Sequence, residues 1–228
     1  MSTVIATSEL TRVFGEGDTS VTALGGVDIE IEADEFTAII GPSGSGKTTL
    51  LHLLGGLDNP TSGQVELSGT NIAAMSGNEL SDFRRDHIGF IFQAYNLIPV
   101  LSAEENIEYI MLLQGVPASE RRARTLEMLH KVGLDGLGDR RPAQLSGGQQ
   151  QRVAVARAMA SEPDIILADE PTANLDSRTG AALLDLMREL NEEQGMTFVF
   201  STHDQMIMDR ARRLLILRDG VIEQDERR

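Results

Sequence analysis

The chain has 228 residues, 41% of them hydrophobic, and its formal net charge is −15. This length suits one large domain or two small ones, and the acidic balance opposes a general nucleic-acid surface, which needs a basic stripe. The lack of cysteine excludes disulfides and thiolate metal sites and fits a cytosolic chain. The sequence has no apolar run of about eighteen residues, so we expect no bilayer-spanning segment.

The chain start carries no targeting pattern that we recognise. Its first ten residues lack a basic start and an apolar block, so we expect no secretion signal. We also expect no lipid anchor, because cysteine is absent and Ser2 replaces the glycine that myristoylation needs. Lysine occurs only at Lys47 and Lys131. Either a GC-rich coding bias or a salt-adapted cytoplasm would explain this scarcity of lysine, and the sequence leaves both explanations open.

The first ninety residues predict short strands around one glycine-rich loop. Residues 21–31 alternate apolar and polar side chains in part, as an antiparallel strand does, and residues 36–40 predict a buried strand. Asp34 lies in the turn between them, where a short polar side chain tolerates a left-handed conformation. Further strands are predicted at residues 63–69 and 88–92, and helices at 49–54 and 79–85.

From about residue 94 the pattern becomes helical. Leu126, Leu129 and Val132 recur at every third position and predict one buried helix face. Strands return after residue 160 and alternate with a helix that Gly195 ends. This alternation predicts a mostly parallel sheet, interrupted by an inserted helical subdomain. The helices are predicted at residues 103–113, 118–132, from 149 and around 183–190, and the strands at 164–168, 197–201 and 214–217.

Residues 41–48 match the phosphate-loop pattern G-x-x-x-x-G-K-[ST] at every fixed position. Its glycines let backbone N–H groups curl around a polyphosphate, and the following helix adds its positive dipole end. A turn that binds nothing is the alternative, but it does not explain the lysine, the hydroxyl and both flanking elements together. Lys47 can reach the terminal phosphates, and the Thr48 hydroxyl can ligate Mg²⁺. The predicted nucleotide-binding residues here are Gly41, Pro42, Ser43, Gly44, Ser45, Gly46, Lys47, Thr48 and Thr49.

A second phosphate-site element ends the apolar strand at residues 165–168. Asp169 and Glu170 follow it at the carboxyl edge, where parallel sheets place their ligands. Asp169 can hold Mg²⁺ directly or through a water, and Glu170 can accept a proton from the water that attacks the γ-phosphate. The alternative is a strand that ends in a solvated acidic turn, and the phosphate loop upstream weighs against it.

Residues 145–152 read Leu-Ser-Gly-Gly-Gln-Gln-Gln-Arg. Ser146 and two glycines at a helix start present a hydroxyl, backbone donors and a helix dipole together. A plain helix cap is the alternative, but it does not explain why three anion-binding features share one chain. On these three motifs the chain closely resembles ATP-binding cassette (ABC) ATPases, over essentially its whole length.

Three further positions match this family. Gln93 corresponds to its Q-loop glutamine, Asp176 closes its D-loop and His203 corresponds to its switch histidine. Alone, His203 would be read as a plain loop histidine, but its place after a strand downstream of Glu170 favours the match. The resemblance implies that Gln93 binds the metal and reports to a permease. It also implies that Glu170 is the base and that His203 contacts the γ-phosphate.

The resemblance implies an α/β fold with a RecA-like P-loop NTPase core, an antiparallel β subdomain and an inserted helical subdomain. We expect one domain over residues 1–228, with its core at about 1–93 and 161–228 and its helical subdomain at about 94–160. The family also implies that two chains sandwich two ATP molecules head to tail, with Mg²⁺. In that dimer, each ATP lies between the phosphate loop of one chain and Ser146, Gly147 and Gly148 of the other. Gln149 and Asp176 are further expected nucleotide-binding residues.

Residues 21–24, 50–58 and 89–99 look like the lipoprotein-release and macrolide-export subgroup, whose permeases act by mechanotransmission. This resemblance implies an ATPase subunit that powers a separate membrane permease from the cytoplasmic face of the inner membrane. We expect the permease to dock between the core and the helical subdomain, near residues 93–105. The apolar residues expected there are Tyr95, Leu97, Ile98 and Leu101, with packed core as the alternative for each.

The chain departs from the family pattern at two positions. Phe14 stands where an aromatic residue, usually tyrosine in this subgroup, stacks on adenine, and we expect stacking to survive because the π-face remains. Asp34 stands where the family commonly has glycine.

One alternative function is that of a soluble ABC ATPase that clamps nucleic acid, which the net charge of −15 opposes. A non-catalytic regulatory cassette would need a damaged Glu170 or signature. The sequence does not name the transported substrate.

Overall fold

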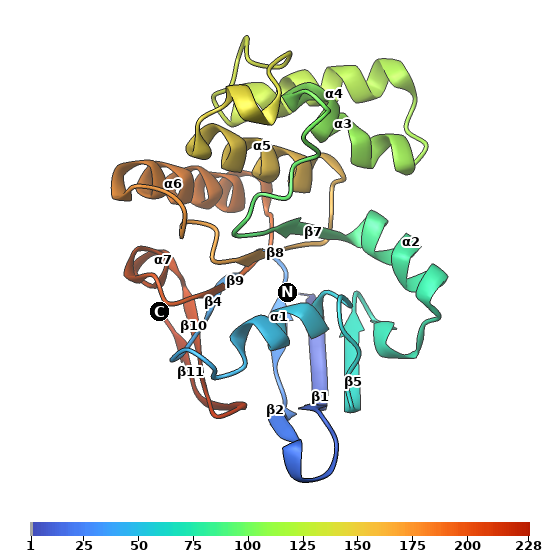
Figure 1. Ribbon diagram of the computed structural model, residues 1–228, viewed down its shortest axis with the longest axis vertical. Coiled ribbons are helices and arrows are strands. Elements are labelled where there is room, and N and C mark those ends of the chain that lie inside the picture. Colours follow the sequence, from blue (N-terminus) through green and yellow to red (C-terminus); the bar gives the residue numbers. More distant parts are fainter. Residues whose placement is uncertain (1) are drawn as a thin grey trace.

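Two β-sheets organise the fold, which the computed structural model describes for residues 2–228 (Figure 1). Met1, part of the segment in which we expected no secretion signal, lies outside the described residues. The larger sheet has six strands in the order β11-β10-β4-β9-β8-β7. All its neighbouring strands are parallel except β10 and β11. Its strands are β4 (Phe36–Ile40), β7 (Ile88–Ile91), β8 (Ile165–Asp169), β9 (Phe198–Thr202), β10 (Arg213–Arg218) and β11 (Val221–Arg227).

The smaller sheet is antiparallel. It has five strands in the order β2-β1-β5-β6, and β3 pairs with β1 beside that path. Its strands are β1 (Thr3–Phe14), β2 (Val21–Val27), β3 (Glu30–Glu32), β5 (Ser62–Leu67) and β6 (Thr70–Asn71). The helices of the chain are α1 (Lys47–Leu54), α2 (Gly77–His87), α3 (Ala103–Leu113), α4 (Ala118–Lys131), α5 (Gly147–Ala160), α6 (Ser177–Gln194) and α7 (Gln205–Arg210). Short 3₁₀ turns occupy Gly17–Thr19, Ile72–Ala74 and Pro142–Gln144.

The larger sheet separates two hydrophobic clusters, because side chains alternate across a strand. In β9, Phe198 and Phe200 enter the cluster under α3–α6, whereas Val199 enters the cluster with α1 and the smaller sheet. Phe36 of β4 joins the first cluster, and its ring centroid lies 4.7 Å from that of Phe200. The continuous apolar runs in the central strands therefore reflect burial on both faces.

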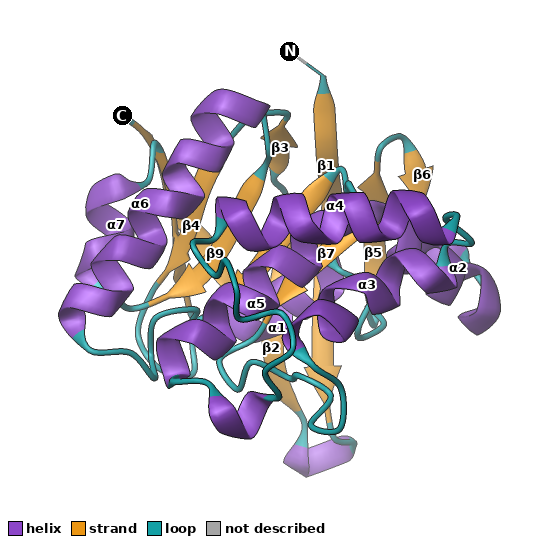
Figure 2. Cartoon of the chain, turned by 90° about the horizontal axis from the view of Figure 1, so that it is seen from above, coloured by secondary structure: helices purple, strands orange, loops and turns teal. Residues whose placement is uncertain are grey.

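The helices form two separate layers. Helix α1 lies between the sheets and contacts β8 and β9 on one side and β2 and β5 on the other. Helices α3, α4 and α5 contact one another, and α5 rests on β7. Figure 2 shows α3, α4 and α5 covering the strands behind them. Within residues 2–228, no helix combines the length and the apolarity needed to cross a membrane.

Several sequence predictions were wrong in detail. Residues 21–31 do not form one strand, because β2 ends at Val27 and β3 begins at Glu30. Leu126 does not share a buried face with Leu129 and Val132, since its side chain is 52% exposed while the other two are buried. A helix turns 100° per residue, so positions six apart differ by about 120° in direction. Asp34 is left-handed as predicted, with φ 67°.

Candidate active site

The loop of residues 41–46 connects β4 to α1 and lies at the N-terminus of that helix. Gly46 caps the helix with φ 103°, a conformation that side chains other than glycine rarely adopt. A Cβ at Gly46 would also lie 2.5 Å from the carbonyl oxygen of Ala23 in β2. The close approach of β2 and the left-handed turn both require glycine at position 46. This backbone conformation places the N–H groups of the loop at the N-terminus of α1.

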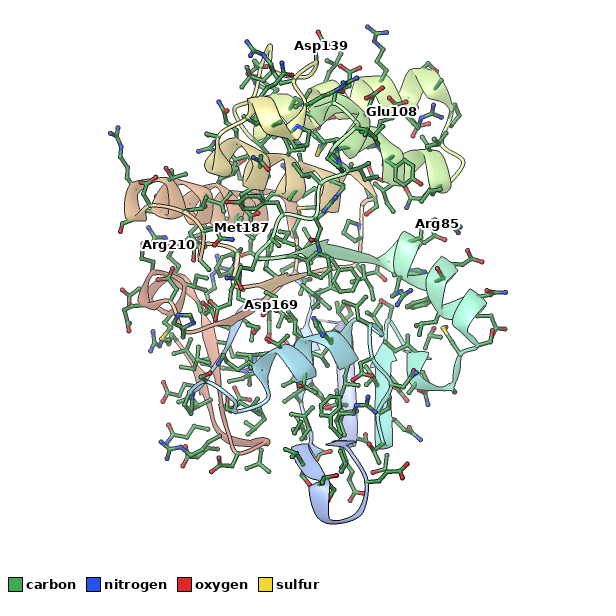
Figure 3. The ribbon with its side chains drawn as sticks, in the orientation of Figure 1. Arg85, Glu108, Asp139, Asp169, Met187 and Arg210 are labelled. Atoms are coloured by element: carbon green, nitrogen blue, oxygen red, sulfur yellow. The ribbon has the colours of Figure 1, made fainter. Side chains whose placement is uncertain are left out.

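Lys47 and Thr48 begin α1 and point their polar atoms back over the loop. Lys47 Nζ donates hydrogen bonds to the carbonyl oxygens of Gly41 at 2.9 Å and of Pro42 at 3.0 Å. The Thr48 hydroxyl donates to Asp169 Oδ1 at 3.2 Å, which joins the loop to the end of β8. Figure 3 shows Asp169 in the middle of the molecule, above α1. Because Lys47 is held by carbonyls alone, its charge remains available to an anion.

Glu170 follows β8 and adopts a left-handed conformation with φ 45°. Its N–H donates to the carbonyl of Ser201 at 2.9 Å, and its Oε2 accepts from the Thr202 hydroxyl at 3.0 Å. His203 Nδ1 lies 2.6 Å from its Oε1. The Glu170 side chain is 16% exposed and that of His203 is 76% exposed. A shielded carboxylate is thus oriented by β9 and faces an open histidine.

These groups line one cleft of about 670 Å³. It brings together the loop, Lys47, Thr48, Thr49, Gln93, Glu170 and His203. Asp169 borders it through its bond to Thr48. Mg²⁺ usually binds one or two carboxylates and completes its shell with phosphates and waters, so Thr48 and Asp169 fit that ion. Residues 2–228 hold no cluster of three or more His, Asp or Glu that would form an all-protein metal cage.

The sequence missed two parts of this cleft. Ala23 lines it from β2, and only the antiparallel sheet brings that residue to the loop. Thr202 orients Glu170, and its place directly before His203 in the sequence was the available signal. The side chain of Ser45 differs from the other loop residues, because it is buried and its Oγ has no hydrogen-bond partner within residues 2–228. Any contribution of Ser45 to an anion therefore has to come from its main chain.

The start of α5 lies outside this cleft. Ser146 caps the helix, accepting from the Gln149 N–H at 3.3 Å, while Gln149 Oε1 accepts from the Ser146 N–H at 2.9 Å. Ser146 is exposed. A Cβ on Gly148 would lie 2.4 Å from Thr179 Cγ2, so α5 touches α6 there. The described chain does not bring its signature segment to its own phosphate loop.

Asp176 also lies outside the cleft and caps α6. Its Oδ1 accepts from the N–H of Arg178 at 3.1 Å and of Thr179 at 3.0 Å, and its Oδ2 accepts from the Thr179 hydroxyl at 2.6 Å. The Thr179 hydroxyl bond is the main cause that lowers the pKa of Asp176 below its ordinary value. Its charge therefore serves the helix start within this chain.

A family profile described as "ABC transporter" matches residues 24–173, which include the phosphate loop, the signature segment and Glu170. The chain belongs to the ABC transporter family. It is 49% identical over 228 residues to an uncharacterized ABC transporter ATP-binding protein of Thermotoga maritima, covering 100% of this chain and 97% of that protein. It is 48% identical over 222 residues to the macrolide export ATP-binding/permease protein MacB of Hyphomonas neptunium. That match covers 97% of this chain and 34% of MacB, so the chain spans about a third of that relative.

A solved structure confirms the fold class. The ATP-binding cassette MJ0796, dimeric in a post-hydrolysis state and bound to ADP and Pi, superposes with a TM-score of 0.90. It is 43% identical and the match covers 98% of each chain. The predicted resemblance to an ABC transporter ATP-binding subunit of the macrolide-export type is thus confirmed, as is the assignment as an ATPase. The individual site residues remain predictions.

Phe14 of the cassette ends β1 outside the residues that line the cleft. Its side chain is 43% exposed, so it is not a core residue. The Arg12 guanidinium lies 4.5 Å from the ring centroid and donates to Asp58 Oδ1 at 2.8 Å. The Arg12 guanidinium therefore covers one face of the Phe14 ring, and an adenine base would stack on the opposite face.

A second cavity of the cassette, about 610 Å³, lies among α2, β7, α3 and α5. Apolar side chains form much of its wall, including Phe90, Tyr109 and Leu113. None of the four residues predicted for permease docking lines it. Those residues are Tyr95, Leu97, Ile98 and Leu101, all half-buried. Leu97 packs against the hydrophobic core, which agrees with the core alternative at that position, and docking at these four residues stays a prediction. We call this cavity the α2–α3 groove.

Proposed function

We propose that this cassette binds MgATP, hydrolyses it as a head-to-tail dimer and drives a separate export-type membrane permease. The observation that carries the proposal is the single cleft that holds Lys47, Thr48, Gln93, Glu170 and His203. A positive charge at a helix N-terminus lies opposite an oriented carboxylate, which is the arrangement that phosphoryl transfer to water needs. We assign the core to residues 1–93 and 161–228 and the helical subdomain to residues 94–160.

The phosphate-binding part of the site is the loop and α1. Lys47 exchanges its bonds to the loop carbonyls for the terminal phosphates, and the backbone N–H groups of residues 43–49 cradle the rest. Thr48, Asp169 and Gln93 would hold Mg²⁺, which would neutralise phosphate charge. These are roles for the side chains as they lie in the cleft, with Thr48 and Asp169 already 3.2 Å apart.

Glu170 is the general base in this proposal. Its left-handed backbone and its bond from Thr202 orient the carboxylate toward the attacking water, whose proton it accepts. His203 contacts the γ-phosphate. The 2.6 Å approach of His203 to Glu170 supports a shared task, because the exposed imidazole also helps to orient the carboxylate.

The signature segment serves a second copy of the chain. Ser146, Gly147, Gly148 and Gln149 begin a helix whose N-terminus is exposed, and the Ser146 hydroxyl lies on the outside of the molecule. Asp176 at the start of α6 lies on the same partner-facing surface in this proposal. The dimeric state of the MJ0796 cassette supports this assembly. The nucleotide's adenine stacks on the open face of Phe14.

The permease docks in the α2–α3 groove. Its apolar wall lies between the core strand β7 and the helical subdomain, so an inserted partner helix would contact both parts. An exposed apolar patch of this kind is a usual sign of a protein partner. The match to MacB, whose name joins an ATP-binding part to a permease, supports a partner of the export type. The cassette would then sit at the cytoplasmic face of the inner membrane.

The groove assignment is tested by co-expression with a candidate export-type permease. Leu113→Glu, which places a charge in the groove, is expected to abolish recruitment to membranes while isolated ATPase activity survives. Leu126→Glu is the matched control, because Leu126 is 52% exposed and Leu113 is 50% exposed, but Leu126 lies outside the groove. Equal recruitment of both variants would place the docking surface elsewhere.

A further inference from the structure

Arg157 is a half-buried cation in the last turn of α5, the helix that begins with the signature segment. Its Nη1 donates to the carbonyl oxygen of Asn96 at 2.6 Å, and its Nη2 donates to that of Tyr95 at 3.0 Å. Burial lowers the pKa of this guanidinium from its ordinary value. A charged group that is partly withdrawn from water is expensive, so its two short bonds to one turn need an explanation.

The turn that Arg157 holds is strained. Tyr95 and Asn96 are both left-handed, with φ 59° and φ 49°, a conformation that disfavours residues with a Cβ. They follow Gln93, which lines the nucleotide cleft. On the other side of the turn, Asn174 Nδ2 donates to the carbonyl oxygen of Gln93 at 2.8 Å. Two side chains from distant segments therefore fix the main chain on either side of residue 94.

We propose that Arg157 is a positioning residue for the ATPase site: its guanidinium fork fixes the turn at Tyr95 and Asn96 and thereby presents Gln93 to the cleft. A planar guanidinium suits this task, because it offers two parallel donors in fixed geometry, whereas an ammonium acts as a single point charge. The catalytic consequence of this positioning rests on the proposed role of Gln93 as a metal ligand. The positioning of the turn does not depend on that role.

Arg157 also lies on the wall of the α2–α3 groove, together with Asn96. The same side chain therefore touches the turn on one side and the proposed docking surface on the other. A groove occupant that offers an acceptor to this guanidinium competes with the two carbonyl oxygens.

The positioning is tested by amide hydrogen exchange on the full nucleotide-free chain. Arg157→Met removes both bonds, and we expect exchange in residues 92–98 to accelerate by about tenfold or more, as the loss of charge-assisted hydrogen bonds predicts. Arg152→Met is the matched control. Arg152 lies on the same helix and donates one bond to the Val132 carbonyl at 2.8 Å, inside the helical subdomain. It should leave exchange in residues 92–98 unchanged.

Two further variants keep the test decisive. Arg157→Lys retains the charge and at most one of the bonds, so it gives an intermediate rate, and it replaces the methionine variant if that protein does not fold. In the Arg157→Met background, Asn96→Gly removes the left-handed strain and should restore part of the protection. Unchanged exchange in both Arg157 variants, or equal acceleration in Arg152→Met, would overturn the positioning role.

The catalytic consequence is measured separately, as the affinity for ATP in the presence of Mg²⁺ divided by the affinity in its absence. Both Gln93→Ala and Arg157→Met are expected to reduce that ratio, and Arg152→Met is not. If Gln93→Ala leaves the ratio unchanged while exchange still accelerates in Arg157→Met, the metal role of Gln93 fails and the positioning stands. If Gln93→Ala reduces the ratio and Arg157→Met does not, Arg157 does not position Gln93 for the metal.

Discussion

The cleft around Lys47 and the exposed start of α5 differ in how many of the groups that a nucleotide site needs are supplied by a single chain. In the cleft, the cation and the hydroxyl at the start of α1 and the oriented carboxylate after β8 converge on one space. At the start of α5, Ser146 and Gln149 hydrogen-bond to each other, and Gly148 packs against Thr179 of α6. Among residues 2–228, the residues that line the cleft include none of these. One region is assembled by the fold of this chain, and the other presents donors outward. The proposed head-to-tail dimer would place these outward-facing donors at the nucleotide site of a second copy.

The largest expected effect lies in the assembled region. Glu170→Gln keeps the shape and the bond from Thr202 but removes the proton acceptor, so hydrolysis should fall by roughly 10²–10⁴-fold while ATP binding persists. A dimer should then accumulate in size-exclusion chromatography with MgATP. Asp164→Asn is the control, since Asp164 lies at the other end of β8 and bonds Ser68 at 2.6 Å. An active Glu170→Gln enzyme would remove Glu170 from the mechanism.

The outward-facing region is tested by Ser146→Arg. Hydrolysis should fall by roughly 10²-fold, as expected for the loss of aligned donors to a reacting phosphate, while monomer ATP affinity changes little. Ser76→Arg is the matched control, because Ser76 caps α2 through the same reciprocal bond, with Glu79 Oε2 at 2.9 Å. A Ser146→Arg monomer that no longer binds ATP would mean that the site is complete within one chain.

Mixing Ser146→Arg chains with Lys47→Ala chains sharpens the same comparison. In a head-to-tail dimer of the two variants, one nucleotide site has both defects and the other has neither. Partial recovery of hydrolysis over either parent is expected if the two sites act independently. A mixture that binds nucleotide and forms mixed dimers, but shows no recovery, would mean that hydrolysis needs both sites intact.

A smaller effect is expected at the adenine side of the assembled region. Phe14→Ala should weaken ATP binding by about 1–2 kcal/mol, a typical loss of aromatic stacking, with little change in turnover at saturation. Phe14→Tyr keeps the π-face and should be nearly silent. Titration of nucleotide affinity measures both variants. Unchanged affinity in Phe14→Ala would assign adenine to another surface.

The smallest expected effect concerns the dimerisation of two chains that each carry a formal net charge of −15. Like charges repel over roughly 10 Å at 0.1 M salt, so screening should favour dimerisation. Raising the salt from about 0.05 to 0.5 M is expected to strengthen MgATP-dependent dimerisation of Glu170→Gln by a few-fold. Weaker dimerisation at high salt, measured by sedimentation, would show that local attractive pairs dominate the interface.

Sequence reasoning predicted the regions that rely on local chemistry and failed where tertiary contacts decide. The phosphate loop is recognisable from its glycine pattern, and the central strands are recognisable from their continuous apolar runs, which are buried on both faces of the sheet. By contrast, β1, β11 and α7 went unpredicted; β11 is a polar edge strand with mostly exposed side chains. The groove wall and the bonds of Arg157 join residues far apart in the sequence, so no local pattern could reveal them.

The close approach of Gly148 to Thr179 has a consequence for how this sequence can evolve. A methyl group at position 148 would meet Thr179 Cγ2 at 2.4 Å, while the Thr179 hydroxyl holds Asp176 at 2.6 Å. Serine at position 179 would remove the obstructing methyl and keep the hydroxyl. Gly148→Ala should therefore arise as a harmful change that Thr179→Ser suppresses. Lineages would reach alanine at 148 only after serine at 179, so the order of the two substitutions is constrained by one methyl group.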